Sequence, residues 1–292
     1  MNVTTDQIEA HRSFTFRLAQ QRKLRSKQEA VKFVQESGFV FFWPIKDVLM
    51  PNLWSAVAGD RPVADAHDDP GHVTWRWKDE MLGTRQWYYA KILRGKATMI
   101  SLNFVPFFYA LSENYGEPEQ DYLQLYQDGL MTREAKVIYE TLLERGPLDT
   151  VMLRRVAQMT SRKSDSPFNR ALTYLQRDFK ILPVGVSDSG GWRYSFVYDA
   201  AHRHYPELPQ QARPIGRSDA RERLVTCYLA SVGAATSGDV RKVFQWHPRD
   251  IRRTLEQLVE RGALQYVEDL PGEKAHYVWP ALCSGSGQPS TL

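Results

Sequence analysis

Outward-facing polar side chains on two predicted helices could bind DNA. Apolar residues recur every three or four positions from Phe168 to Phe179, so the positions between them face outward on a helix. Arginine and asparagine donate hydrogen bonds to base edges, and lysine and arginine neutralise phosphates. We expect Asn169, Thr173 and Arg177 to reach base edges or phosphates, and the following residues to reach the DNA backbone: Arg170 and Lys180. The equivalent residues on a later helix are Arg249, Arg252 and Arg253.

The elements that position the first set lie within residues 131–199. Thr132 caps a helix that ends at Gly146-Pro147, Asp149 caps a second helix, and Ser166-Pro167 opens the third. A polar turn then joins a strand over 181–186 to an alternating aromatic strand over 192–198. Three helices followed by a two-stranded wing predict a winged-helix domain, whose third helix enters the major groove.

The same order of elements returns in residues 217–283. Helices are predicted over 220–232 and 237–244 and from Pro248, which places the second arginine set on the third helix. Strands at 264–267 and 275–278 flank a turn at 270–273. A polar connector, 200–216, separates the two units, and the Gly/Ser-rich tail, 284–292, is predicted to be disordered. The fold class expected is therefore α+β, with tandem winged-helix domains.

Residues 1–130 are predicted to form an N-terminal winged-helix-like domain. Helices are expected over 5–21 and 27–37, followed by a buried extended segment, Gly38 to Ile45, that Pro44 ends. Strands are expected at 73–77 and 87–93, and helices near 104–114 and 121–128. The aromatic extended segment distinguishes this unit from the other two.

Composition and charge agree with a folded protein that has a polyanionic partner. The 292 residues are 42% hydrophobic and 25% charged, and a positive excess lies in residues 131–292, which hold 23 Lys and Arg against 18 Asp and Glu. No long apolar run or signal peptide is seen, and the two cysteines have no metal-binding spacing. We expect a cytoplasmic protein, nucleoid-associated if bacterial, that binds double-stranded DNA without a cofactor, a metal or a membrane.

The extended segment also carries a resemblance to a known family. Gly38-Phe39-Val40-Phe41-Phe42-Trp43-Pro44-Ile45, with Leu53-Trp54-Ser55 downstream, resembles the motif of the AlkZ/YcaQ-type winged-helix DNA glycosylases. That family reads approximately Gly-aromatic-Val-Gln-x-Gln/Asp-Pro-Ile, then Leu-Trp-Ser, and releases alkylated or crosslinked bases. The resemblance extends to the tandem winged helices and is to a shorter AlkZ-related branch, in which a C-terminal β-domain is absent or reduced. It implies a DNA-repair function.

The two catalytic positions that the resemblance implies fall on Phe41 and Trp43. Neither side chain can orient or activate a water molecule as an amide or carboxylate can. Because residues two apart on a strand project to the same side, we expect a paired aromatic surface there. It either stacks on an extruded base or plugs the cleft as core, and the plug is slightly favoured.

Two other groups of residues could replace the lost catalyst. Lys46 and Asp47 follow the motif, and a desolvated lysine beside a carboxylate would suit a lyase, although solvent-facing residues after a turn are far commoner. The run from Asp65 to His72 is rich in histidine and aspartate, which could bind a metal ion but are also ordinary loop formers beside Pro70-Gly71.

Three functions follow from these patterns. The first is a DNA-binding relative of the alkylation and crosslink-repair glycosylases, with base excision lost or altered. The second is an active glycosylase with a rewired site, for example Asp47 with a water molecule. The third is a winged-helix scaffold for protein contacts, in which the arginines are ordinary solvated surface residues.

Overall fold

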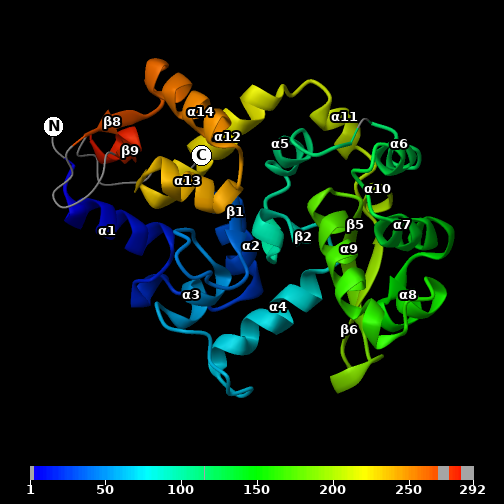
Figure 1. The fold of residues 1–292 in the computed structure, drawn as a ribbon. Helices are drawn as coiled ribbons and strands as arrows, with labels where there is room; N and C mark the ends of the chain where they lie inside the picture. The colour runs from blue at the N-terminus through cyan, green and yellow to red at the C-terminus, as the bar shows by residue number, and fades with distance from the viewer. Residues whose placement is uncertain (1–2, 115, 269–275, 284–292) are drawn as a thin grey trace.

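The computed structural model describes residues 3–114, 116–268 and 276–283. Its elements repeat one order three times: helix, strand, helix, helix, strand, strand (Figure 1). The strands of each repeat form an antiparallel three-stranded sheet in which the last strand lies in the middle. The α+β class is confirmed, and the repeated order is compatible with a helix-turn-helix followed by a β-wing. The turn expected at 270–273 and the tail at 284–292 lie outside the described residues.

The first repeat contains the aromatic motif. Its elements are α2 (Lys27–Ser37), β1 (Phe39–Phe41), α3 (Leu53–Ala58), α4 (Val73–Met81), β2 (Tyr88–Ala90) and β3 (Thr98–Ile100). It also contains the short helices η2 (Pro70–His72) and η3 (Leu93–Gly95), and α1 (Thr5–Thr15) and η1 (Gln20–Arg22) precede it. The first helix is therefore shorter than the predicted 5–21.

The strand predicted at 73–77 is wrong, because this segment belongs to α4. Asp69 accepts a hydrogen bond from the Gly71 amide, and Pro70 starts the short helix that leads into α4. Thr74, Trp77 and Lys78 are buried at helical spacing, three and four residues apart. Val73, Trp75 and Trp77 alternate with polar residues, which is the pattern typical of a half-buried strand. β3, the central strand that lies between β1 and β2 in the sheet, was not predicted from the sequence.

The second repeat matches the sequence prediction closely. Its elements are α7 (Arg133–Arg145), β4 (Leu148–Asp149), α8 (Thr150–Val156), η4 (Arg162–Ser164), α9 (Asp165–Arg177), β5 (Ile181–Ser187), η5 (Gly191–Arg193) and β6 (Ser195–Ala200). The helices α5 (Val105–Tyr109) and α6 (Asp121–Gln127) lead into it. Phe168, Leu172 and Leu175 of α9 pack into a hydrophobic core that this repeat forms largely from its own residues. As predicted, the other side of α9 faces outward.

The third repeat follows a folded connector. It consists of α12 (Arg217–Val232), β7 (Ala234–Ala235), α13 (Ser237–Phe244), α14 (Pro248–Glu260), β8 (Gln265–Val267) and β9 (His276–Val278), with η6 (Pro280–Leu282) after it. The connector expected over 200–216 contains α10 (Ala201–His204) and α11 (Leu208–Ala212), and α11 packs against α5. It is therefore part of the packed structure.

The first and third repeats share one hydrophobic core. The rings of Phe39 and Phe244 lie 5.9 Å apart, and the Tyr228 hydroxyl donates to the Leu49 carbonyl at 3.0 Å. These two repeats lie together on the left of Figure 1, with the second repeat on the right and α13 and α9 on either side of the boundary. Within the described ranges, no helix is both long and apolar enough to cross a bilayer.

Candidate nucleic-acid interface

The outward face of α9 carries most of the first predicted residue set. Asn169, Arg170 and Arg177 are exposed, and Thr173 is half-buried, with its hydroxyl donating to the Asn169 carbonyl at 2.9 Å. Together with Asp165, Ser166 and Tyr174 these residues line one open groove of about 710 Å³. The helix thus brings the predicted side chains into one continuous surface.

The charge of this groove is positive. Among the described residues, neither Arg170 nor Arg177 forms an ion pair, and Arg170 donates a hydrogen bond to the Ser166 hydroxyl. Of the described residues that line the groove, one is a carboxylate, Asp165, and it is paired with Arg154 of α8. Two uncompensated guanidinium groups therefore face a site that an anion can approach.

Lys180 does not belong to this surface, and its predicted DNA contact is wrong. Its side chain is 1% exposed, and its Nζ lies 2.8 Å from Asn114 Oδ1 and 3.0 Å from Asp178 Oδ2. The chain turns at Phe179, where φ is 56°, so the helical phase that faces outward ends before Lys180. Lys180 instead connects α9 to the segment after α5.

The second predicted set lies on the exposed side of α14. Arg249, Arg252 and Arg253 are exposed, and none of them has an ion pair within the part of the chain that the structure describes. Asp250 lies among them, but its carboxylate is engaged by Arg221 Nη2 at 3.0 Å. This helix therefore presents three cationic groups, and Asp250, the acid beside Arg249 and Arg252, is already paired with Arg221.

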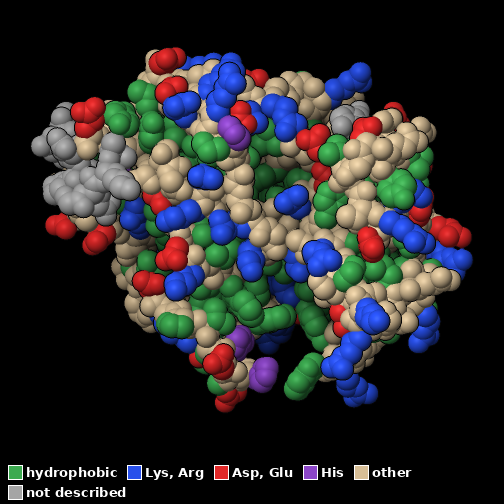
Figure 2. All heavy atoms as spheres, viewed as in Figure 1, with side chains coloured by type: hydrophobic (Ala, Val, Ile, Leu, Met, Phe, Trp, Pro, Cys, Tyr) green, Lys and Arg blue, Asp and Glu red, His purple; other side chains and the backbone are tan. Residues whose placement is uncertain are grey.

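Basic residues that the sequence analysis missed lie between these helices. The short helix η3 of the first repeat contacts both α9 and α13, and its Arg94 donates to the Lys242 carbonyl. Close approach requires Gly95: a Cβ there would lie 3.0 Å from Thr173 Cγ2. A cavity of about 300 Å³ joins Arg94 to Arg177 and Gln245. Lys96 follows η3 and Arg241 precedes Lys242 in the sequence, and both are exposed. Figure 2 shows Lys and Arg side chains on both sides of the depression between α13 and α9.

Phe41 and Trp43 of the aromatic motif are both packed against other side chains. Phe41 is 1% exposed in the core shared by the first and third repeats, whereas Trp43 is half-buried against a different cluster. The expectation that the two project to one side is wrong because β1 ends at Phe41 and the chain bends at Phe42. Trp43 stacks on Phe42 instead, with ring centroids 5.4 Å apart, and packs edge-on against Trp75 at 5.4 Å.

A buried lysine lies behind this aromatic layer. The Lys78 side chain has no exposed surface, and its Nζ lies 2.7 Å from Asp79 Oδ1 and 2.8 Å from the Tyr194 hydroxyl. Burial lowers the pKa of Lys78, and Asp79 acts in the opposite direction. Five rings surround the ammonium group within 6 Å and form what we call the Lys78 cage: Phe42, Trp75, Tyr89, Tyr194 and Phe196. The cage joins α4 of the first repeat to β6 and its preceding turn in the second.

The two groups considered as replacement catalysts lie in largely exposed segments. Lys46 and Asp47 are both exposed, and neither forms an ion pair with another described residue. In the loop from Asp65 to His72, Asp69 binds Arg61 at 2.6 Å, and His72 Nε2 lies 2.9 Å from the Ala64 carbonyl. The hydrogen bond from Arg61 lowers the pKa of Asp69. Over the described ranges, no group of three His, Cys, Asp or Glu residues could hold a metal ion.

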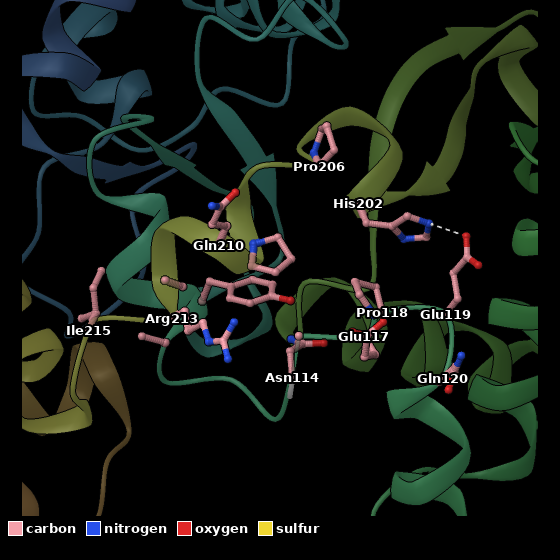
Figure 3. Close-up of a pocket in the computed structure, with 15 residues that line it drawn as sticks. Asn114, Glu117, Pro118, Glu119, Gln120, His202, Pro206, Gln210, Arg213 and Ile215 are labelled. Carbon is pink, nitrogen blue, oxygen red and sulfur yellow. Dashed lines mark ion pairs between the residues drawn. The ribbon is translucent and has the colours of Figure 1, made fainter.

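A cavity of about 810 Å³ is lined by none of the predicted residues, although Asn114 on its wall binds Lys180 (Figure 3). Residues from 109–114, 116–120 and 202–215 line it, and His202 Nε2 lies 3.5 Å from Glu119 Oε1 across its edge. Burial lowers the pKa of His202, and Glu119 opposes that effect. Two carboxylates, Glu117 and Glu119, line this cavity against one arginine, Arg213, so its charge is less suited to a phosphate backbone than that of the α9 groove.

Comparisons with known proteins agree with the fold. The model of a family described as AlkZ related matches residues 24–245. Among solved structures, the DNA glycosylase AlkZ of Streptomyces sahachiroi has a TM-score of 0.59 and 12% sequence identity to this chain, with 100% of this chain and 74% of that one covered. A search of curated protein sequences gave no match. The matched segment includes the aromatic motif and the whole of α9.

Proposed function

This chain belongs to the AlkZ-related family, and we propose that it binds double-stranded DNA through the outward faces of α9 and α14. The observation that carries the proposal is the groove of α9, where Arg170 and Arg177 have no carboxylate partner among the described residues and lie beside Asn169. An α-helix fits the major groove, where arginine and asparagine can form paired hydrogen bonds to bases. The basic residues of η3 and α13 would then contact the flanking phosphates.

The units that bind would be three tandem winged-helix domains. We propose the divisions 1–130, 131–199 and 217–283, with the folded connector at 200–216 between the last two. The thrice-repeated element order and sheet order support this division. By analogy with other winged-helix domains, the helix before the wing would be the recognition helix of each unit. These helices are α4, α9 and α14. Of these, α4 is packed against the second unit through the Lys78 cage, so α9 and α14 are the two available to DNA.

We further propose that base excision of the family's water-dependent kind is lost. Phe41 is buried and has no polar side-chain atom. The indole nitrogen of Trp43 is buried and can only donate a hydrogen bond, so neither position offers an acceptor that could activate a water molecule beside a sugar. Asp47 is exposed and forms no ion pair with another described residue, so no partner positions it as a replacement base. DNA recognition would remain while hydrolysis would not.

The test is equilibrium binding of a fluorescent duplex at several salt concentrations. The logarithm of the binding constant falls linearly with the logarithm of the salt concentration, and each phosphate contact adds about one to the magnitude of that slope. The double variant Arg170→Ala with Arg177→Ala should therefore reduce the magnitude of the slope by roughly two. Arg145→Ala removes an exposed arginine of α7 and serves as the matched control. If the unmodified chain has no affinity for duplex DNA at low salt, the binding proposal is wrong.

Loss of excision has a separate test. Duplexes that carry alkylated or crosslinked bases are incubated with the chain and then treated with alkali, which cleaves at abasic sites. We expect no cleavage above the level seen without protein. Cleavage that disappears in Asp47→Asn would support the rewired glycosylase instead.

A further inference from the structure

The tip of the hairpin between β5 and β6 presents a tryptophan to solvent. Trp192 is 97% exposed, and within the described part of the chain its indole makes no ring contact or hydrogen bond. Tryptophan side chains are on average highly buried, and tryptophan is enriched among the residues that contribute most to binding interfaces. The position therefore points to a partner that the isolated chain does not contain.

The backbone holds this side chain outward. Trp192 and Arg193 have φ values of 63° and 52°, in the left-handed region that bulky residues rarely adopt. Strained residues of this kind persist where the surrounding structure fixes them, and they concentrate at ligand-binding sites. Gly191 has nothing within 4 Å of its Cβ direction, so the turn leaves open space beside the indole.

The rest of the hairpin is anchored on both sides of the tip. Tyr194, two residues after Trp192, donates to Asp79 Oδ1 at 2.8 Å and packs in the Lys78 cage. On the other side, a Cβ placed on Gly190 would lie 3.4 Å from Val151 of α8. Trp192 is thus a projecting side chain on a braced support, which reduces the ordering cost of binding.

The chemistry around the indole selects a nucleobase as the partner. Arg193 is exposed directly beside Trp192 and can contact a phosphate, and the one exposed carboxylate of the turn is that of Asp188. The hairpin follows α9 in the same repeat, so a duplex on α9 would bring its backbone towards the wing (Figure 1). An aromatic ring stacks on any base whose face is free, and protein wedges enter steps that are already weakened.

We propose that Trp192 stacks on a base whose face is exposed at an interruption of the duplex, such as an abasic site or an unpaired nucleotide. This inference rests on the proposed function, because α9 must first place the duplex. Arg193 would hold the phosphate next to that base. The hairpin would then distinguish damaged from intact DNA without reading its sequence.

The test compares two duplexes of the same length and sequence, one intact and one with a single abasic-site analogue. The unmodified full chain should bind the interrupted duplex about tenfold more tightly, the order of one base-stacking contact. Trp192→Ala should remove this preference, and Trp192→Phe should keep most of it. Leu130→Ala removes another exposed apolar side chain, outside the wing, and should leave the preference unchanged.

The outcomes separate the two proposals. If the unmodified chain binds both duplexes equally, or if Trp192→Ala keeps the preference, the stacking inference is overturned while DNA binding stands. If neither duplex binds, the proposed function fails and the inference fails with it. Iodide quenching gives a second readout. Iodide should quench more tryptophan fluorescence in the unmodified chain than in Trp192→Phe, because Trp192 is exposed. This difference between the two chains should disappear when the interrupted duplex is added.

Discussion

The Lys78 ammonium group lies 2.8 Å from the Tyr194 hydroxyl, although these residues belong to different repeats and are 116 positions apart. The contact is part of a closed set, because Tyr194 also donates to Asp79, the acid that pairs with Lys78. A charge with no exposed surface is tolerated where its hydrogen bonds are satisfied and aromatic faces surround it. The position of α4 against the second repeat therefore depends on a polar contact inside an aromatic layer.

Removing either side of this contact should destabilise the chain by different amounts. Tyr194→Phe deletes one hydrogen-bonding group from a largely satisfied set and should lower the free energy of unfolding by about 1–2 kcal/mol. Lys78→Met leaves the Asp79 carboxylate without its partner, and we expect a loss of about 3–5 kcal/mol. Urea unfolding followed by circular dichroism measures both. Arg76→Ala, on the exposed side of α4, is the control; a loss as large as that of Lys78→Met would contradict the assignment.

Lys180 and Arg177 should separate stability from DNA affinity. Lys180→Met removes a buried cation from between Asp178 and Asn114, so we expect a loss of stability of about 3 kcal/mol and an unchanged salt dependence of DNA binding. Arg177→Ala removes an exposed cation, so we expect little change in stability and a salt slope reduced by about one. Thermal unfolding and anisotropy titrations on the same preparations give both quantities. Equal effects of the two variants on the salt slope would show that Lys180 does reach DNA.

Gly95 should tolerate no side chain, for two reasons that can be separated. Its φ is 64°, and an added Cβ would lie 3.0 Å from Thr173 Cγ2 on α9. Gly129 has a φ of 72° and nothing within 4 Å, so Gly129→Ala carries the backbone cost alone, about 1–2 kcal/mol. Gly95→Ala should therefore cost more stability than Gly129→Ala and should weaken DNA binding by displacing η3, and with it Arg94, from α9. Equal costs in urea unfolding, with DNA affinity unaltered, would mean that η3 does not need its close approach to α9.

Stability should fall when the pH is lowered below about 6.5. Burial lowers the pKa of His11, the hydrogen bond to the Ala230 carbonyl acts to raise it, and Arg12 lowers it further. The pKa of His11 is therefore lower in the folded chain than in the unfolded chain. Its contribution to the free energy of unfolding is complete above the unfolded pKa and is lost as the pH falls through the folded pKa. Unfolding free energies measured from pH 7.5 to 5.0 should decline less in His11→Gln than in the unmodified chain. His67→Gln, in an exposed loop, is the control, and an identical decline in His11→Gln would contradict the linkage.

Local periodicity was sufficient to identify the outward face of α9. Phe168, Leu172 and Leu175 repeat at helical spacing, so Asn169 and Arg177 were assigned to the solvent side from the sequence alone. The same reasoning predicted the hairpin after α9 and the order of elements in the third repeat. These features depend on residues within one or two turns of each other, whose relative directions follow from helix and strand geometry.

Tertiary structure decided both the departures from regular local geometry and the contacts across repeats. The sequence alone placed Phe41 beside Trp43, Lys180 on the DNA face and a strand where α4 lies, and each of these depended on a chain bend, a buried ion pair or a cap whose effect extends beyond local spacing. The approach of η3 to α9, and of Tyr194 to Lys78, joins residues far apart in the sequence. Composition and periodicity specify which face of an element is apolar, but only packing of whole elements determines which distant polar side chains meet.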